Sequence, residues 1–530
     1  MDSRSLLACS SLQIPPPVLP GASVNYLTAL PVFNKSAYVP ETAFPNHGSI
    51  NVTDASFCLV SLAYTHTHQT DSVHVQVWLP MDDSWNERMM GLGGGGFWCG
   101  LLPETMLAML GAVGEGYAAV STDCGHTATQ GLADWLLTEP GKINLQLLED
   151  FASLSLNEAA IIGKNVAESF YGVKPRYSYW SGCSQGGRQG MMLARRFPDA
   201  YDGIVASAPA LNWAEILVAG FWTQFVMNQL DEYPSPCELD FLTSVAIAFC
   251  DTLDAGEDGI VANIDACNFN PFHMVGVSIA CGDEIIPVSR SAAIVAEAAW
   301  KGPVTEDGER LGPGVDVVAS LTNFFSSQCS ANGLCTGLPV LYSSDWIRVA
   351  VKKDPNFDLS SITQAEFMQI FNESVKEYKA IIGTDDPDLS AFRQRGGKIL
   401  AFHGLADPMI PSRGTRRYYE SVARVDPHVR SYYRLFEAPG LGHCRFGSSG
   451  LYPATIFDDL VAWVEEGEVP RSLPASFTDE NGTKQERILC PYPQFASHDI
   501  GADPSEADSY FCSRIYPGFH SNVVLEEGEM

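Results

Sequence analysis

The fold can be predicted from one segment, Arg176-Tyr-Ser-Tyr-Trp-Ser-Gly-Cys-Ser184-Gln-Gly-Gly-Arg188. Residues 176–180 are typical of a short buried strand, and residues 188–196 are typical of a helix. The turn between them matches G-x-S-x-G, the nucleophile elbow, in the strand–turn–helix context that this motif requires. Glycines flank the serine because side chains at those positions would collide in so sharp a turn. Ser184 is therefore a candidate nucleophile, and the alternative is a tight turn without chemistry.

The segments around the elbow alternate between strand and helix patterns. Because short buried strands alternate with helices, we predict an α/β fold of the α/β-hydrolase class, with a largely parallel sheet covered on both faces. The predicted strands are 72–79, 89–92, 116–122, 397–404 and 430–436, and the predicted helices are 144–170 and 455–465.

The alternation stops in the middle of the chain. Residues 212–394 are rich in aromatic residues, cysteine and proline, which indicates an insertion domain. Residues 1–211 and 395–530 are then the two parts of one catalytic domain. The last stretch, which contains Cys490 and Cys512, is expected to be an irregular tail held by a disulfide.

Charge and hydropathy exclude some partners. The 530 residues include 32 Lys and Arg against 63 Asp and Glu, a net charge of −31. So acidic a chain is repelled by nucleic-acid phosphates and anionic lipid, which makes both poor partners. No run of about 18 apolar residues predicts a transmembrane helix. The oligomeric state stays open.

The fourteen cysteines are scattered, and none forms a C-x-x-C pair. This distribution favours disulfides over a zinc or iron–sulfur site. Four N-x-S/T sequons, at Asn34, Asn51, Asn372 and Asn481, are candidates for glycosylation. Residues 1–13 lack the apolar core of a signal peptide. The cysteines nevertheless predict an extracellular protein.

An elbow serine needs a base and a carboxylate, in the chain order Ser, Asp or Glu, His. Asp407 directly follows the strand 397–404, and His443 comes 36 residues later in a glycine-rich loop. We predict both as members of a catalytic triad with Ser184. Asp407 could instead be a turn aspartate before proline. Of the rival bases, His403 precedes the carboxylate and is expected to be structural, and His520 lies near an irregular terminus.

Two cysteines flank the proposed pair. Cys183 precedes Ser184, and Cys444 follows His443. If the serine and the histidine are in contact, these cysteines could reach the Cα separation of roughly 5.5–6 Å that a disulfide requires. Such a bridge would hold the nucleophile close to its base. The alternative is two unrelated cysteines, with Cys183 as a small buried apolar residue.

These residues resemble the tannase/feruloyl esterase family, its fungal feruloyl esterase B branch especially. The family's mark is a Cys-Ser at the elbow, a later Asp and a His-Cys pair with the two cysteines bonded, and the likeness runs from about Cys9 to Cys512. It implies an α/β-hydrolase with a lid between nucleophile and acid. It also implies a secreted hydrolase of feruloyl-type esters or feruloylated saccharides, with galloyl esters second. A serine peptidase or a non-catalytic binding protein would be a different reading of the same serine.

The resemblance also implies a second donor to the oxyanion. The N–H of Gln185 would be joined by that of Gly94 or Gly95, in the run of four glycines at 93–96. A flexible turn without chemistry is the alternative. The lid should cover the acyl pocket, and some of its aromatic residues could stack on a phenolic ring, although most are expected to be core: Trp213, Phe221, Trp222, Phe324 and Phe325.

A further implication is a structural Ca²⁺ ion in the lid. Three aspartates lie within eight residues, and such carboxylates repel one another unless a cation or solvent relieves them. Their spacing does not match an EF-hand, and a solvated acidic turn is the alternative. The family pattern implies side-chain ligands at Asp251, Asp254 and Asp258 and carbonyl ligands at Gly256 and Ile260.

The family pattern also suggests disulfide pairs, namely Cys250–Cys267, Cys9–Cys58 and Cys490–Cys512. The sequence lacks the family cysteine expected upstream of Cys58 as the partner of Cys99. Six cysteines therefore remain without a predicted partner: Cys99, Cys124, Cys237, Cys281, Cys329 and Cys335.

Overall fold

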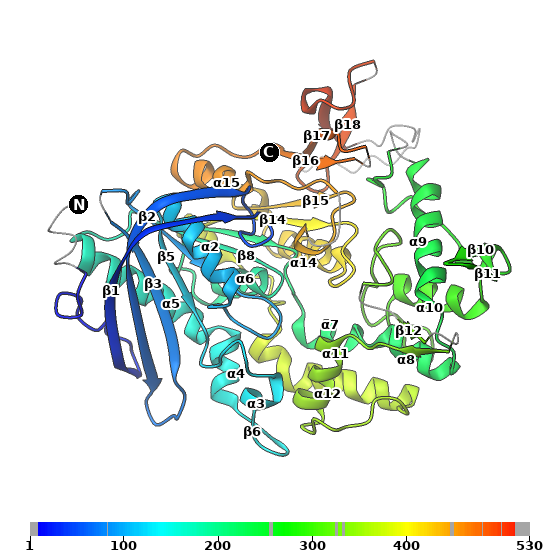
Figure 1. Ribbon diagram of the computed structural model, residues 1–530, viewed down its shortest axis with the longest axis horizontal. Coiled ribbons are helices and arrows are strands. Elements are labelled where there is room, and N and C mark those ends of the chain that lie inside the picture. The colour runs from blue at the N-terminus through cyan, green and yellow to red at the C-terminus, as the bar shows by residue number, and fades with distance from the viewer. Residues whose placement is uncertain are drawn as a thin grey trace.

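The computed structural model describes residues 9–81, 83–253, 258–323, 327–330, 334–445, 450–479, 481–499 and 501–514. Its centre is a nine-stranded sheet (Figure 1). In spatial order the strands are β1 (Ala22–Val39), β2 (Ile50–His66), β3 (Val73–Pro80), β5 (Ala118–Thr122), β4 (Arg88–Leu92), β8 (Tyr177–Cys183), β9 (Gly203–Ser207), β14 (Lys398–Gly404) and β15 (Tyr433–Ala438).

The sheet is antiparallel at one end and parallel at the other. β1, β2, β3 and β5 pair antiparallel, and the strands from β5 through β4, β8, β9 and β14 to β15 pair parallel. Every residue of β5 and of β9 is buried, which explains why these strands are continuous apolar runs.

Helices cover both faces of the sheet. α2 (Pro103–Gly114) and α15 (Ile456–Glu465) pack with one hydrophobic cluster, and α5 (Leu154–Tyr171), α6 (Gln185–Arg196) and α14 (Ser412–Val425) pack with another. Alternate residues of β5 divide between the two clusters, Val120 facing one and Ala119 the other. The predicted α/β-hydrolase fold is therefore confirmed.

One predicted helix is wrong in its extent. The apolar spacing at 144–170 continues through two helices, α4 (Leu145–Ala152) and α5, because Ser153 breaks the helix with a φ of −166°. The carbonyls of Phe151 and Ala152 bind the buried side chain of Arg188 instead of continuing the helical ladder. An apolar period cannot reveal such a break.

The insertion lies between two strands that are neighbours in the sheet, because β9 pairs directly with β14. Part of it shares the core of the sheet, and α9 and α10 contribute to a separate apolar cluster. The boundaries at 212 and 394 stay a prediction. The inserted elements are α7 (Trp213–Ala219), α8 (Trp222–Leu230), α9 (Pro236–Asp251), η1 (Pro271–Met274), β10 (Ser278–Cys281), β11 (Glu284–Pro287), α10 (Arg290–Lys301), β12 (Ser327–Cys329), β13 (Cys335–Gly337), α11 (Leu341–Asp345), η2 (Trp346–Val351), α12 (Gln364–Ile382) and α13 (Ser390–Gln394).

The C-terminal stretch is more regular than the sequence predicts. It forms two small antiparallel sheets, β16 (Leu473–Thr478) with β17 (Lys484–Leu489) and β18 (Phe495–His498) with β19 (Tyr510–Ser513). The Cys490–Cys512 disulfide holds them. The remaining short elements are α3 (Leu132–Leu136), β6 (Leu137–Glu139), β7 (Lys142–Ile143), η3 (Val429–Ser431), η4 (His443–Arg445) and η5 (Ala507–Ser509).

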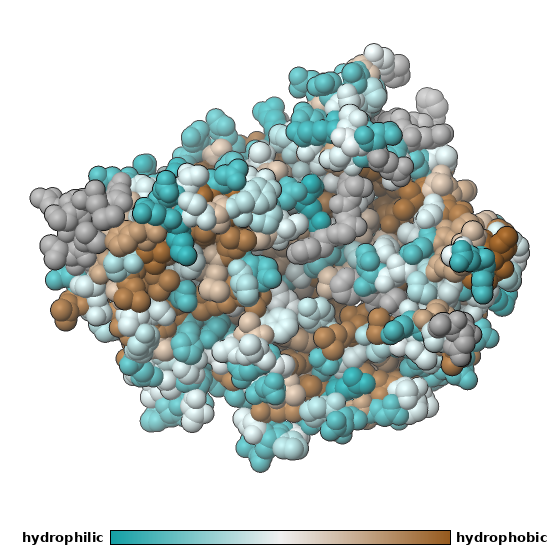
Figure 2. All heavy atoms as spheres, in the orientation of Figure 1, coloured by the Kyte–Doolittle hydropathy of each residue, from teal (hydrophilic) through white to brown (hydrophobic). Residues whose placement is uncertain are grey.

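Hydrophilic and hydrophobic residues are interspersed over the face shown in Figure 2. None of the helices in the described part of the chain is long and apolar enough to cross a membrane.

Candidate active site

Ser184 lies at the sharp turn between β8 and α6. Its φ of 62° and ψ of −122° are strained for a residue with a side chain. The two motif glycines allow this turn: a Cβ at Gly182 would lie 2.4 Å from the backbone of Gly186, and one at Gly186 would lie 2.9 Å from the carbonyl oxygen of Gly94. Ser184 is partly exposed between buried neighbours. The elbow thus presents the hydroxyl at the surface of a pocket.

The parallel strands bring the other two predicted residues to the same edge of the sheet. Asp407 follows β14, and His443 follows β15, the neighbouring strand. His443 Nδ1 and Asp407 Oδ2 are 2.7 Å apart, and both residues are buried, at 5% and 2% exposure. His443 and Ser184 line the same pocket. The three residues are therefore gathered where the sequence predicts them.

The Asp407 carboxylate is fully engaged. Its Oδ1 accepts hydrogen bonds from the N–H groups of Met409 and Ile410, at 2.8 and 3.0 Å. Burial alone would raise the pKa of this carboxyl, but the charge of His443 and the hydrogen bonds from His403 and His443 hold it well below its ordinary value. Asp407 therefore remains an anion that can orient an imidazole.

His403 has a role that sequence reasoning did not identify. It is buried, as expected of a packed histidine, but its Nε2 lies 3.1 Å from Asp407 Oδ2 and 3.0 Å from the carbonyl oxygen of Ile410. Its Nδ1 is 2.8 Å from Thr415 Oγ1. Asp407 thus sits between two imidazoles, and of these two only His443 lines the pocket. The four-residue spacing from His403 to Asp407 was the one sequence feature that could have indicated this contact.

The cysteines beside the serine and the histidine are joined. Cys183 and Cys444 form a disulfide, with their Cα atoms 5.9 Å apart. Cys444 has a left-handed backbone, with a φ of 49°. This bridge connects the end of β8 to the loop that carries His443 and so limits how far the two catalytic candidates can separate. His520, the rival base, lies outside the described residues.

A pocket of about 830 Å³ opens beside Ser184. Aromatic side chains that line it are Trp98, from the loop after the glycines, and Trp213 and Tyr342, from the insertion. Among its described lining residues Glu104 is the one acidic side chain, and none is Lys or Arg. The pocket is therefore shaped for a mainly apolar, uncharged group.

Of the three predicted lid aromatics that the structure describes, Trp213 lines the pocket. Phe221 and Trp222 are packed in the core instead. Phe324 and Phe325 lie outside the described residues. Sequence reasoning missed Trp98 and Tyr342, because lining depends on how the insertion packs onto the body.

The backbone amides of Gly94 and Gly95 differ in their hydrogen bonding. The N–H of Gly94 donates to Gln189 Oε1 at 3.2 Å. The N–H of Gly95 has no partner among the described residues, Gly95 lines the pocket, and a Cβ there would meet nothing within 4 Å. Gln185 occupies the first helical position after Ser184, where a backbone N–H has no partner within the helix. Of the two candidate glycines, Gly95 is the better placed to hold an oxyanion.

Part of the predicted calcium loop is described. Asp251 Oδ2 accepts from the N–H of Gly259 at 2.9 Å, and Asp258 forms an ion pair with Arg487 at 2.8 Å. The Cys250–Cys267 disulfide closes the loop. Asp254 and Gly256 lie outside the described residues.

All fourteen cysteines are paired. The four expected pairs are present: Cys183–Cys444, Cys250–Cys267, Cys9–Cys58 and Cys490–Cys512. The six cysteines without a predicted partner form Cys99–Cys124, Cys237–Cys281 and Cys329–Cys335. Cys99 thus finds a partner downstream in place of the missing upstream one. The four sequon asparagines are all exposed.

The sheet, the serine elbow and the pocket at the carboxyl ends of the strands define the α/β-hydrolase class. Comparison with known proteins narrows this class. Residues 58–513 match the family model described as tannase and feruloyl esterase, and the chain belongs to this family of carboxylic ester hydrolases.

Relatives agree over nearly the whole chain. A protein of Arthroderma benhamiae named probable feruloyl esterase is 40% identical over 97% of this chain and 94% of its own length. The structure of the tannin acyl hydrolase from Aspergillus niger matches with a TM-score of 0.86 and 27% identity, covering 96% of this chain and 95% of that one. Feruloyl esterase B from Aspergillus oryzae matches with a TM-score of 0.77 and 25% identity, covering 96% and 100%.

Proposed function

We propose that the protein hydrolyses aromatic carboxylic esters, hydroxycinnamoyl esters first, with Ser184 as nucleophile, His443 as base and Asp407 as orienting acid. The observation that carries this proposal is the 2.7 Å contact between His443 Nδ1 and Asp407 Oδ2. The loop of His443 is also joined to the elbow of Ser184, through the disulfide between the neighbouring residues Cys183 and Cys444. A non-catalytic protein has no need of this arrangement.

The geometry supports acyl transfer to water. Ser184 Oγ attacks the ester carbonyl carbon while His443 Nε2 accepts its proton, and Asp407 holds Nδ1–H in place. The amides of Gln185 and Gly95 stabilise the negative oxygen of the tetrahedral intermediate. His443 then gives the proton to the departing alcohol. Water, deprotonated by His443, attacks the acyl-enzyme and releases the acid and Ser184.

The pocket supports an aromatic acyl group. Trp98, Trp213 and Tyr342 can contact a phenolic ring through their faces or edges, and the absence of Lys and Arg among the described lining residues disfavours a charged acid. The names feruloyl esterase and tannin acyl hydrolase among the relatives support hydroxycinnamoyl esters as the first proposed substrates and galloyl esters as the second.

A hydrolysis panel of methyl ferulate, methyl caffeate and methyl gallate tests the substrate, and Ser184→Ala tests the mechanism. We expect methyl ferulate to give the highest kcat/KM and the variant to lose at least about 10⁴-fold in kcat. Ser343→Ala is the matched control, because Ser343 also lines the pocket without an elbow. Substantial hydrolysis by Ser184→Ala would refute the nucleophile, and peptide turnover without ester turnover would indicate a peptidase.

We also propose a structural Ca²⁺ ion in the loop closed by Cys250–Cys267. The carboxylate and carbonyl oxygens of this loop are the donors that a hard cation prefers. The Asp251 carboxylate lies near Asp258, because it accepts a hydrogen bond from the N–H of Gly259, the next residue. Asp251, Asp258 and the Ile260 carbonyl would hold the ion together with Asp254 and Gly256. Arg487 already offsets one of the charges. The ion would stabilise the insertion and take no part in the chemistry.

Removing calcium should therefore lower stability without changing the triad. We expect EDTA to lower the Tm of the wild-type protein and added CaCl₂ to restore it, and we expect Asp251→Asn to blunt both effects. Elemental analysis should find one calcium per chain. An unchanged Tm together with no bound metal would contradict the proposal.

An extracellular location is proposed on two grounds, the seven disulfides and the exposure of Asn34, Asn51, Asn372 and Asn481. Protein recovered from the medium of an expressing fungus should lose mass on treatment with an N-glycosidase. Retention of the whole product in the cytosol would contradict this location.

A further inference from the structure

We propose that Gln189 is a positioning residue, which ties the glycine turn at 93–96 to the nucleophile helix and so aims the Gly95 amide at the oxyanion. This inference rests on the proposed function, because it assumes that the oxyanion forms beside Ser184. Gln189 does not line the pocket, and it would act only through the turn.

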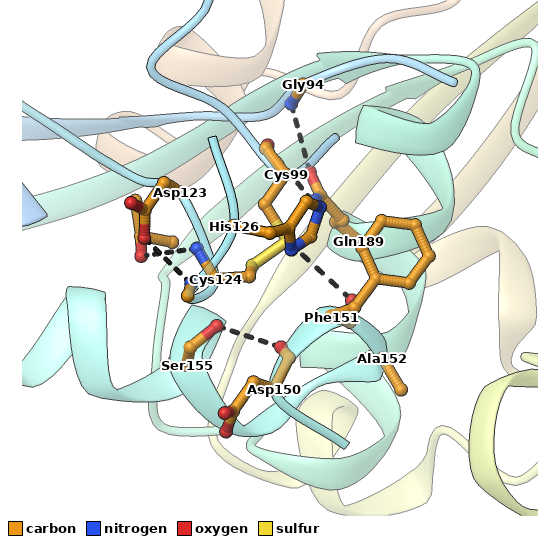
Figure 3. Close-up of a disulfide and its surroundings, with 12 residues drawn as sticks. Gly94, Cys99, Asp123, Cys124, His126, Asp150, Phe151, Ala152, Ser155 and Gln189 are labelled. Carbon is orange, nitrogen blue, oxygen red and sulfur yellow. Dashed lines mark hydrogen bonds between the residues drawn. A yellow bond between two sulfur atoms is a disulfide. The ribbon is translucent and has the colours of Figure 1, made fainter. Parts of the chain in front are cut away.

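The side chain of Gln189 makes two hydrogen bonds to the turn and its continuation (Figure 3). Its Oε1 accepts from the N–H of Gly94 at 3.2 Å, and its Nε2 donates to the carbonyl oxygen of Cys99 at 3.1 Å. The residue is fully buried, at 0% exposure. One side-chain amide thus satisfies a donor and an acceptor of the same loop, because Gln carries both groups on one planar unit.

Gln189 is well placed on its helix for this task. It lies four residues after Gln185, one turn along α6, so both project from the same side of the helix. Gln185 carries the first oxyanion amide, next to Ser184. A single rigid helix therefore holds the nucleophile, one oxyanion donor and the side chain that binds the loop of the other donor.

The turn is packed onto Gln189 too closely to shift freely. A Cβ at Gly93 would lie 2.7 Å from Gln189 Oε1, and one at Gly94 would lie 2.4 Å from the Cys99 carbonyl. The N–H of Gly93 also donates to the carbonyl oxygen of Ser181, at 3.1 Å. Glycine is needed at these positions because the backbone itself contacts its support.

The far end of the loop is covalently held. Cys99 is bonded to Cys124, which follows β5 in the central sheet (Figure 3). The turn is thus fixed at Gly93 by β8, at Gly94 by Gln189 and at Cys99 by the disulfide. The amides of Gly95 and Gly96 have no partner among the described residues, and both residues line the pocket; of the two, Gly95 is the one next to the held Gly94.

The consequence for catalysis is a cost in the transition state only. A neutral ester carbonyl gains little from a well-aimed amide, whereas the negative oxygen of the tetrahedral intermediate depends on it. Loosening the turn should therefore lower kcat and leave KM nearly unchanged.

Gln189→Met tests this, because methionine has similar size and neither hydrogen-bonding group. We expect kcat for methyl ferulate to fall about 10- to 100-fold, with KM within about twofold. Affinity for a phenylboronic acid, which forms a tetrahedral adduct on the serine, should fall by a similar factor. Gln189→Asn, which is one methylene too short to span both partners, should show the same pattern and serves if the methionine variant does not fold.

Gln224→Met is the matched control, since Gln224 is also buried but lies on α8, outside the pocket lining. It should leave kcat and boronate affinity unchanged. A folded Gln189 variant with wild-type kcat and wild-type boronate affinity would overturn the inference, and so would equal losses in Gln224→Met. The proposed nucleophile is tested separately, by Ser184→Ala, so its failure can be told apart from a failure of this inference.

Discussion

At the level of single residues, the sequence motifs predicted some members of the candidate site and missed others. The elbow pattern and the chain order predicted Ser184, Asp407 and His443 as candidates, because strand ends and glycine turns are visible in the sequence. The choice between Gly94 and Gly95 was not visible. It depends on Gln189, which is 95 residues away and takes the Gly94 amide. Likewise, the four-residue spacing from His403 to Asp407 is visible in the sequence, but it does not reveal that both His403 and His443 contact Asp407 Oδ2.

Arg188 is the most unusual single residue near the site. Its guanidinium is fully buried, and none of the described carboxylates pairs with it. It donates to the carbonyl oxygens of Phe151 and Ala152, at 3.0 and 2.9 Å, and to Gln185 Oε1 at 2.6 Å. Burial lowers its pKa to about 9, so it stays charged at neutral pH. It therefore caps the C-terminal end of α4 with a cation.

Arg188→Met should destabilise the protein, because it leaves these buried carbonyls without donors. We expect a loss of about 2–4 kcal/mol in the free energy of unfolding, measured by urea denaturation. Arg196→Met, at an exposed position of the same helix, is the control and should cost less. Equal stability of Arg188→Met and the wild type would show that the carbonyls find other partners.

At the level of secondary structure, the parallel strands explain why distant segments meet. β8, β14 and β15 all end at the same edge of the sheet, so their loops bring Ser184, Asp407 and His443 together. Strand existence was predictable from apolar runs. The break at Ser153 and the small C-terminal sheets were not, because they depend on tertiary hydrogen bonds and on pairing between segments that lack a strong period.

The Cys183–Cys444 disulfide should contribute to both stability and rate. We expect Cys183→Ala/Cys444→Ala to lower the free energy of unfolding by about 2–5 kcal/mol. It should also lower kcat for methyl ferulate, because the loop of His443 gains freedom relative to the elbow.

The control for this prediction is Cys329→Ser/Cys335→Ser. That disulfide closes a short loop, with a sequence separation of 6 against 261, and its cysteines do not line the pocket. It should leave kcat unchanged. An unaltered kcat in the Cys183/Cys444 variant would mean that strand pairing alone holds the site.

For the whole molecule, composition predicted that residues 212–394 interrupt the sheet, but not how they pack. α7 and α12 share the core of the body and so bring Trp213 to the pocket beside Ser184, whereas α9 and α10 contribute to a separate apolar cluster. The three disulfides without a predicted pairing were also not predictable, because they too depend on how the chain packs. Spacing along a chain does not specify which cysteines the fold brings within reach.

Acid sensitivity of the whole fold should depend on His47. It stacks on Phe44 at 3.7 Å between ring centroids, and burial lowers its pKa to about 3. The unfolded chain binds this proton below about pH 6.5 and the folded protein does not. Stability should therefore fall as pH drops from 6.5 toward 3, by at most about 1.4 kcal/mol per pH unit from this group.

His47→Phe removes this proton site and can retain the stacking. We expect its free energy of unfolding to fall less than that of the wild type between pH 6.5 and 4.5, measured by urea denaturation at several pH values. Parallel pH profiles for the two proteins would show that other groups account for the acid sensitivity.

The central claim is that Ser184 forms the acyl-enzyme with His443 and Asp407 in support. The most direct measurement is mass spectrometry of the protein after reaction with a fluorophosphonate, with peptide mapping and methyl ferulate hydrolysis followed in parallel. We predict one adduct per chain, on Ser184, formed in step with loss of hydrolysis and absent from His443→Ala. Full loss of hydrolysis with the adduct on another residue, or full labelling of Ser184 with hydrolysis intact, would contradict the account.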